Sequence, residues 1–189
     1  MSHPAFGIHS TALPGCLELS PPRQQDERGS FVKVFHRDAF AALKLPVDFP
    51  EVYYSVSQRN VVRGLHFQTP PAQHAKLVYC PQGRVQDAVL DLRAGSPTFG
   101  QHFIVELSSE AANMLYIPPG LAHGFRTLSD TAIVAYHVSS QYSPEHDQGI
   151  LWNSAGIAWG IEQPILSERD ATHPALADFA TPFHYEGDA

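Results

Sequence analysis

Short alternating runs of apolar and polar residues predict a protein built almost entirely from β-strands. The apolar positions are rich in Val, Ile, Tyr and Phe, and sixteen prolines and thirteen glycines punctuate the chain between these runs. This texture is typical of a β-sandwich or β-barrel. The predicted strands are Ser30–His36, Val52–Ser57, Val61–Gln68, Lys76–Pro81, Arg84–Arg93, Gly100–Leu107, Asn113–Ile117, His123–Thr127 and Thr131–Ser139.

Helical patterning is confined to two short stretches. We expect one short helix at Asp38–Leu43 and a helical turn at Ser108–Ala112, with Ser108 as its N-cap. No linker, fixed-period repeat or low-complexity segment divides the chain, so the sequence predicts one domain over residues 1–189. The segment from about Asn153 onward mixes turns with short apolar pieces, and we expect it to cover the barrel.

Alternation within the strand Val61–Gln68 predicts which side chains point the same way. A period of two places His66 on the same face as Gly64, with Arg63 on the opposite face. A glycine within a strand leaves space where a ligand or another backbone approaches closely. We therefore expect room beside His66.

An acidic residue interrupts the apolar face of the strand Arg84–Arg93. Asp87 alternates in phase with Val85 and Val89. A carboxylate on an apolar face costs free energy unless it has a partner. Asp87 then either orients a histidine or forms an ion pair with an arginine, and the pattern leaves both open.

Composition indicates a globular protein and argues against a nucleic-acid binder. Hydrophobic residues make up 43% of the 189-residue chain and charged residues 16%. The formal net charge is −7, whereas binding to nucleic acid usually needs a basic face. Any anionic ligand must therefore meet a local cluster of Arg and Lys.

Two cysteines, Cys16 and Cys80, show no spacing typical of zinc or of a disulfide framework. With no apolar stretch of about 18 residues and no leader pattern, we expect a cytoplasmic protein without a membrane partner.

The run from Arg63 to Gln68 (RGLHFQ), followed by Lys76 on the next strand, carries the first sign of chemistry. It brings a histidine and two cations toward one small volume. A base removes a proton beside a carbonyl, and a cation stabilises the oxyanion that forms. This combination favours proton abstraction on an anionic substrate.

A series of strings along the chain resembles the dTDP-4-dehydrorhamnose 3,5-epimerase family. The resemblance covers roughly residues 10 to 170, and many matches in the same order are specific to that family. It implies a cupin-type double-stranded β-helix (jelly-roll) barrel with short peripheral helices, a homodimer, and a nucleotide-linked 4-keto-6-deoxyhexose as substrate. It implies no cofactor and no metal. The strings are DERGSF (26–31), RGLHFQ (63–68), KLV (76–78), DLR (91–93), SPTFG (96–100), IPPGLAHGF (117–125), YSPEHD (142–147), GILWN (149–153) and ILSERD (165–170).

The resemblance also implies a catalytic set. His66 matches the base that removes the proton beside the C4 ketone, and Asp170 matches its carboxylate partner. Lys76 matches the lysine that stabilises the enolate oxygen. Tyr136 matches the proton donor on the opposite face of the sugar ring. Two proton-handling groups on opposite faces are what inversion at carbon requires.

The implied substrate-binding positions are more widely scattered. Arg28 and Arg63 match positions that contact the diphosphate, and planar guanidinium groups suit phosphate. Lys33 stands where many members carry Glu, in a segment that contacts the nucleotide base, so a CDP or other nucleotide carrier stays open. Whether C3, C5 or both carbons are inverted also stays open. The remaining implied substrate contacts are Phe31, Gln68, Asp87, His123 and Asp147.

Three other functions compete with the epimerase. A metal-dependent cupin oxygenase needs a His-x-His pair, but Gln68 follows His66 at that spacing, and only His123 matches a later ligand. A 3,4-ketoisomerase places paired histidines on the site strand, which this strand lacks. A non-catalytic sugar-nucleotide-binding barrel gives no reason for the catalytic set. Trp152 and Trp159 are predicted to pack in the core or its cover rather than stack on a base.

Overall fold

The computed structural model describes residues 5–187. The opening Met1–Pro4, where the sequence shows no leader pattern, lies outside them. No helix in the described part is long and apolar enough to cross a membrane. The strands are β1 (Gly7–Ser10), β2 (Leu17–Ser20), β3 (Arg23–Asp26), β4 (Gly29–Val32), β5 (Glu51–Gln58), β6 (Val62–Gln68), β7 (Lys76–Gln82), β8 (Arg84–Asp91), β9 (His102–Ser108), β10 (Met114–Ile117), β11 (Leu121–Thr127), β12 (Thr131–Val138) and β13 (Asp147–Gly149). The helices are α1 (Arg37–Ala42), α2 (Glu168–Ala171) and the 3₁₀ turn η1 (Leu176–Asp178).

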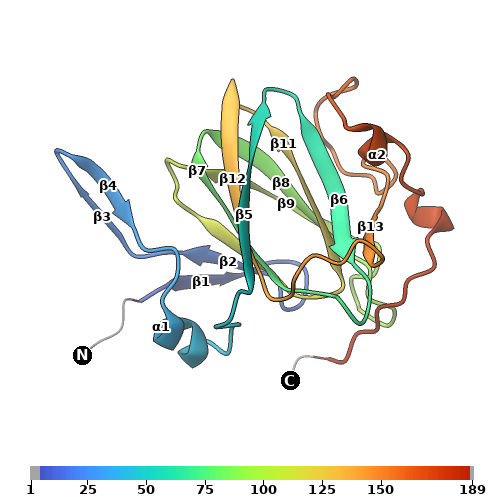
Figure 1. Ribbon diagram of the computed structural model, residues 1–189, viewed down its shortest axis with the longest axis horizontal. Coiled ribbons are helices and arrows are strands. Elements are labelled where there is room, and N and C mark those ends of the chain that lie inside the picture. Colours follow the sequence, from blue (N-terminus) through green and yellow to red (C-terminus); the bar gives the residue numbers. More distant parts are fainter. Residues whose placement is uncertain (1–4, 188–189) are drawn as a thin grey trace.

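Two antiparallel sheets form the body of the molecule (Figure 1). The six-stranded sheet runs β1-β2-β10-β7-β12-β5, and the five-stranded sheet runs β13-β6-β11-β8-β9. The apolar core between them includes Val78, Val89, Leu115 and Phe125, all buried. This is the predicted cupin-type jelly roll, and the all-β expectation is confirmed. The arrangement matters for function because side chains from two different sheets converge on the barrel interior.

Segments outside the barrel cover part of each of its outer faces. Phe40 of α1 packs against Leu77 on the outside of the six-stranded sheet. On the five-stranded sheet, Phe67 of β6 packs in one cluster with Trp159 and Phe183 from the C-terminal segment. Burial of Trp159, 2% exposed, agrees with its predicted packing role, and its indole nitrogen donates to the Trp152 carbonyl at 2.7 Å.

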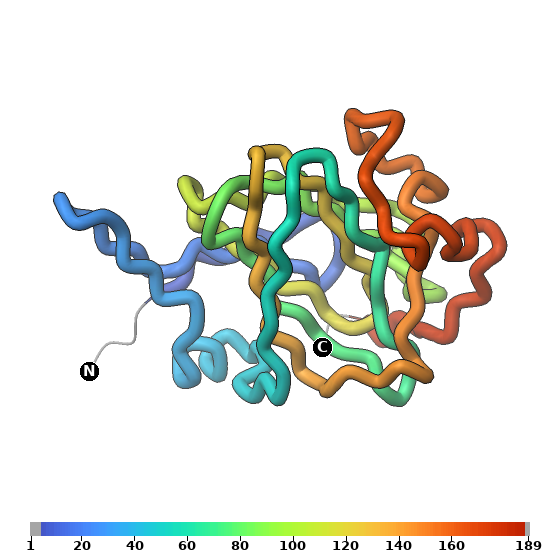
Figure 2. Tube along the Cα trace, turned by 45° about the horizontal axis from the view of Figure 1, so that its top comes forward, coloured from blue at the N-terminus to red at the C-terminus, as the bar shows by residue number. Residues whose placement is uncertain are grey.

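The hairpin of β3 and β4 projects away from the barrel, on the opposite side of the molecule from α2 and β13 (Figures 1 and 2). Among residues 5–187, its strands pair only with each other. Arg28 lies in the turn at its tip, and its side chain is 85% exposed. Phe31 on β4 is 62% exposed, an unusual position for a phenylalanine in an isolated chain.

The predicted strands are present with shifted ends, and four short strands escape the pattern. β1, β2, β3 and β13 have three or four residues each, too few to establish an alternation. At Ser108–Ala112 the expected cap is present, because Ser108 Oγ accepts from the Ala111 amide at 3.1 Å. The segment forms a turn rather than a helix.

The alternation predicted for β6 is wrong at Gly64. This glycine has φ +120°, and the pairing of β6 with β11 shifts register beside it. A Cβ at Gly64 would lie 2.6 Å from Gly124 Cα, so only glycine permits the close crossing. Beyond the irregularity, Leu65 turns outward into the cluster beneath the C-terminal segment. Arg63 consequently lies on the interior side with His66, not opposite it.

Candidate active site

His66 of β6 and Asp170 of α2 form a hydrogen-bonded pair. His66 Nε2 is 2.6 Å from Asp170 Oδ1. The carboxylate is held in place from two further directions. Ser167 caps α2 by accepting from the Asp170 amide at 3.1 Å, and the Gly64 amide donates to Oδ2 at 3.3 Å. The pair occupies Nε2, so Nδ1 is the ring nitrogen available to a substrate.

The protonation states of the pair suit a general base. Burial lowers the pKa of His66, and the neighbouring charges of Lys76 and Arg169 add to this effect, while Asp170 opposes it. The imidazole is therefore neutral near pH 7. Burial alone would raise the pKa of Asp170, but the adjacent His173 and His66 rings and the Gly64 amide outweigh it and keep the pKa well below its usual range. Asp170 is an anion that can stabilise a protonated His66.

Lys76 contacts the backbone of His66. It is the first residue of β7, is buried, and its Nζ donates to the His66 carbonyl at 3.0 Å. Burial lowers the pKa of Lys76 to about 8, against the opposing charges of Asp147 and Asp87. At neutral pH it is a cation in a poorly solvated site, and a cation in such a site is suited to stabilise a developing oxyanion.

Tyr136 approaches from the other sheet. It lies on β12 opposite Tyr53 of β5, and the two rings stack with centroids 4.9 Å apart. Burial raises the pKa of Tyr136 far above its ordinary value, so the phenol keeps its proton. Tyr53 is 40% exposed and lines the pocket, whereas Tyr136 lies beneath it. His66 and Tyr136 thus come from opposite walls of the barrel.

His123 and Asp87 form a second histidine–carboxylate pair inside the barrel, and neither residue lines the pocket described below. His123 Nε2 is 2.8 Å from Asp87 Oδ2, and both are buried. His123 lies directly opposite His66 in the β11–β6 register, and its ring contacts Tyr136 edge to face. Of the two alternatives open for Asp87, the structure shows the histidine one. Burial raises the Asp87 pKa, and His123 and Lys76 counteract this.

A pocket of about 300 Å³ opens onto His66. Arg169, adjacent to Asp170 in the chain, forms an ion pair with Asp147 at 2.8 Å at the pocket wall. Arg169 lies within the ILSERD string, but no pattern in the sequence predicted its place in the pocket. The same holds for His74 and Tyr142. The lining residues are Glu51, Tyr53, His66, Gln68, His74, Val138, Tyr142, Asp147 and Arg169.

Gln68, a predicted substrate contact, lines the pocket, but its amide is held by neighbouring loops. Its side chain is buried, and Nε2 donates to the Ala72 carbonyl at 2.8 Å. Its Oε1 accepts from the Ser143 amide at 2.6 Å. Both ends of the amide are therefore committed to neighbouring loops. The effect is to fix the loop that carries Tyr142 into the pocket.

The predicted diphosphate and base contacts are divided. Arg63 is half-buried in the barrel, where Nε donates to Ser57 Oγ at 2.9 Å. Arg28 is bound only to Asp26 at the hairpin tip, among the contacts recorded for residues 5–187. Phe31 lies on β4 and Lys33 directly follows it, so both belong to the projecting β3–β4 hairpin and its base, residues 23–33, which we call the arm. Within one chain, the structure does not bring these three residues to the His66 pocket (Figure 1).

His66, Asp170 and His173 place three ligand-type atoms within 4.8 Å of one another. The His66–Asp170 contact of 2.6 Å is a hydrogen-bond length. Two ligands of a tetrahedral zinc ion lie about 3.3 Å apart. The His66–Asp170 contact is therefore that of a shared proton.

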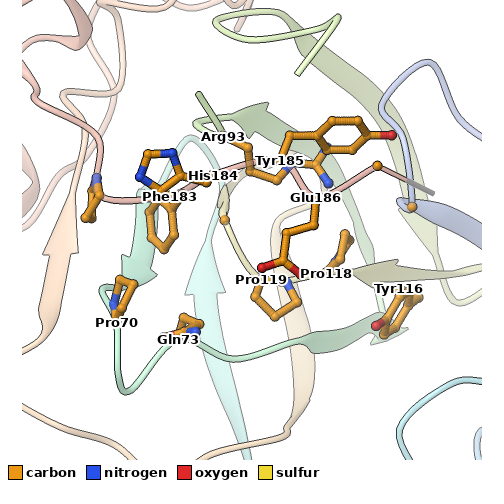
Figure 3. A pocket seen from close by; sticks show the side chains of 14 residues that line it. Pro70, Gln73, Arg93, Tyr116, Pro118, Pro119, Phe183, His184, Tyr185 and Glu186 are labelled. Carbon is orange, nitrogen blue, oxygen red and sulfur yellow. The ribbon is translucent and has the colours of Figure 1, made fainter. Parts of the chain in front are cut away.

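A larger pocket of about 750 Å³ lies where the C-terminal residues pass the β10–β11 turn (Figure 3). Arg93 lines it, but its guanidinium is held by Asp91 at 2.8 Å and lies over the Tyr185 ring. None of the predicted catalytic residues lines this pocket. The chemistry therefore belongs to the smaller pocket at His66.

Comparisons with known proteins place the chain in a family. The family model described as dTDP-4-dehydrorhamnose 3,5-epimerase matches residues 10–178. The dTDP-4-dehydrorhamnose 3,5-epimerase of Salmonella typhimurium is 44% identical over 173 residues, covering 89% of this chain and 94% of that protein.

Solved structures show the same likeness. The Legionella pneumophila dTDP-6-deoxy-D-glucose-3,5-epimerase, in complex with dTDP-4-keto-L-rhamnose, is 34% identical with a TM-score of 0.92, over 97% of this chain and 100% of that one. A 3'-monoepimerase from Streptomyces bikiniensis, in complex with dTDP-quinovose, is 34% identical with a TM-score of 0.84, over 89% and 87%. The chain belongs to the dTDP-4-dehydrorhamnose 3,5-epimerase family.

Proposed function

We propose that this protein inverts C3 and C5 of a dTDP-linked 4-keto-6-deoxyglucose through enolate intermediates. The observation that carries the proposal is that two proton-handling groups enter the barrel from its two different sheets. The neutral His66, paired with Asp170, comes from the five-stranded sheet. The protonated Tyr136 comes from the six-stranded sheet.

Each inversion then follows from the protonation states. His66 Nδ1 takes the proton from the carbon beside the C4 ketone, and the C–H electron pair moves into the enolate. Lys76 stabilises the negative charge on the enolate oxygen, while Asp170 stabilises the imidazolium. Tyr136 delivers a proton to the opposite face of that carbon, and solvent restores both groups. The same sequence at the second carbon completes the reaction without a cofactor or metal.

The diphosphate of the substrate needs positive charge, and one chain brings only part of the predicted set of cations to the pocket. Arg63 and Arg169 supply positive charge on the interior side and at the pocket wall. We propose that a second copy of the chain supplies Arg28 and Phe31 from its projecting hairpin, in a homodimer. In support, β5 is the last strand of its sheet and exposes Val52 and Tyr54, an apolar edge suited to burial against another chain.

Incubation of the protein with dTDP-4-keto-6-deoxyglucose in deuterated water tests the proposed reaction. Deuterium entering both C3 and C5 is the expected result, detected by NMR of the sugar. Deuterium entering C3 alone would make the protein a mono-epimerase. This alternative is tested because the similar Streptomyces bikiniensis protein is a 3'-monoepimerase. Absence of deuterium at both carbons rejects this substrate.

The nucleotide carrier is a separate part of the proposal. Lys33, in the arm that also bears Phe31, is the reason to test a CDP-linked sugar beside the dTDP-linked one. We expect the dTDP sugar to give the higher kcat/KM.

We further infer one domain, comprising the barrel and its C-terminal cover, and a cytoplasmic location, in keeping with the free thiols of Cys16 and Cys80.

A further inference from the structure

His173 lies against the catalytic pair but has no role in the mechanism above. Its Nε2 is buried, lies 3.6 Å from Asp170 Oδ1, and makes no hydrogen bond of ordinary length within residues 5–187. Its ring meets the His66 ring edge to face, with centroids 5.7 Å apart. Gly149 of β13 lies opposite His66 in register, and any side chain there would collide with the His173 ring. The local backbone thus makes room for a second histidine beside Asp170.

The surroundings of His173 select its tautomer. An unprotonated Nε2 would direct a lone pair at an anionic oxygen inside the protein, an unfavourable arrangement. With a proton on Nε2, the same atom becomes a donor directed toward Asp170 Oδ1. That oxygen already accepts from His66 Nε2 at 2.6 Å. Two N–H groups then share one carboxylate oxygen.

We propose that His173 is a positioning residue that acts on the base His66 through Asp170, as a second donor to the same carboxylate oxygen. A carboxylate that shares its charge with two donors attracts the His66 imidazolium less strongly than one with a single donor. His173 therefore keeps His66 in its neutral, proton-accepting form. The proposal rests on the proposed function only in naming His66 as the base, because its proton equilibrium is a property of the free protein.

Removal of His173 should leave the carboxylate in place. Asp170 Oδ2 is held by the Gly64 amide, and Ser167 caps the helix that carries it. The other charged groups that act on His66 are Lys76 and Arg169, and neither hydrogen-bonds to Asp170 within the described residues. A variant without the second donor therefore strengthens the attraction between Asp170 and a protonated His66.

NMR titration of the His66 ring nitrogens in the full-length protein tests the proposal directly. In His173→Phe we expect the titration midpoint of His66 to rise by roughly one pH unit. In His173→Gln, whose side-chain amide is a donor, it should stay near the wild-type value. His102→Phe, on β9 and outside the pocket, is the control and should leave it unchanged. An unchanged or lowered midpoint in His173→Phe overturns the proposal.

A double-mutant cycle shows whether the effect passes through Asp170. In an Asp170→Asn background, His173→Phe should produce no further shift of the His66 midpoint. A full shift in that background contradicts the proposal. If His173→Phe does not fold, as judged by its thermal melt, His173→Leu takes its place.

Enzyme kinetics separate positioning from a merely structural role. With the dTDP sugar, the acidic limb of the kcat/KM profile should move upward in His173→Phe by the same shift, with the plateau retained. A uniform loss at every pH instead indicates disruption and rejects the proposal. Failure of the proposed reaction would appear separately, as absence of deuterium incorporation by the wild-type protein, and would leave the titration result standing.

Discussion

At the scale of single residues, His66 and Lys76 need opposite protonation states at the same pH. A base must be neutral, whereas a group that stabilises an enolate must be charged. Burial provides both, because it disfavours the charged form of each. It lowers the His66 pKa from 6.5, which frees the base. It lowers the Lys76 pKa from 10.5 to about 8, which still leaves a cation at neutral pH.

This opposition predicts a bell-shaped pH profile. kcat/KM should fall below pH 6.5, as His66 becomes protonated, and should fall again as pH rises through about 8, where Lys76 loses its proton. Initial rates of deuterium incorporation across the pH range measure both limbs. Lys76→Arg should move the alkaline limb upward, because guanidinium does not titrate there. An unmoved alkaline limb in that variant assigns it to another group.

Substitutions in the His66–Asp170 pair and at Tyr136 should affect different steps of the reaction. His66→Ala and Asp170→Asn remove the base or its partner, and we expect each to slow deuterium incorporation by roughly 100-fold or more. Tyr136→Phe retains the base, so it should leave proton exchange largely intact and impair net inversion. NMR of deuterium content and of product configuration in one reaction separates these outcomes. Normal exchange in His66→Ala contradicts its role.

Some residue-scale features could be predicted and others could not. The strings around His66 and Asp170 predicted that these two residues pair, and the structure shows them hydrogen-bonded. Asp87 was left between two partners, because choosing His123 over an arginine depends on how β8 and β11 align in space. Gln68 has a side chain that suits a ligand as well as a loop, and only its contacts show that it serves the loop.

At the scale of elements, β6 shows why strand periodicity succeeds in general and fails locally. Alternation assumes a regular pleat, and the bulge at Gly64 resets it by one position. A glycine in the sequence signalled a close approach, but not that Arg63 would change faces. The irregularity has a consequence for the site, because it places Arg63 and His66 on one interior surface while Leu65 anchors the outer cover.

The close crossing of β6 and β11 predicts a large cost for Gly64→Ala. A new Cβ would press on Gly124 Cα at a backbone conformation that disfavours side chains, so we expect a loss of about 3–5 kcal/mol in the free energy of unfolding. Gly95→Ala is the matched control, with φ +82° but open space around the added atom, and should cost only about 1 kcal/mol. Urea unfolding measures both. Equal losses would show that the crossing contributes nothing.

At the scale of the whole molecule, one chain holds the chemistry in its barrel and part of the predicted binding set on a distant arm. The sequence strings could not reveal this division, because they do not say which copy of the chain each contact serves. Arg28 and Phe31 have little to stabilise within their own chain, since one is exposed in a turn and the other on an unsupported hairpin. A dimer in which each arm reaches the partner's pocket gives both residues a function.

Complementation between inactive variants tests that division of labour. An Arg28→Ala/Phe31→Ala chain should bind substrate weakly as a homodimer, and a His66→Ala chain should be unable to remove the proton. In a mixed dimer, the site that has the intact His66 receives the intact arm from its partner. Co-refolding equal amounts should therefore restore about a quarter of wild-type activity, since about half of the dimers are mixed and each holds one complete site.

The matched control for this experiment uses two barrel lesions, one in each chain. His66 and Asp170 belong to one pocket of one chain, so co-refolded His66→Ala and Asp170→Asn chains leave every site with one defect and should remain inactive. Light scattering establishes the dimer in each sample. Activity no greater than the sum of the separate variants would show that the arm serves its own chain or none. Recovery in the first mixture but not in the second assigns the arm to the partner's site, because no other arrangement makes one complete site from these two chains.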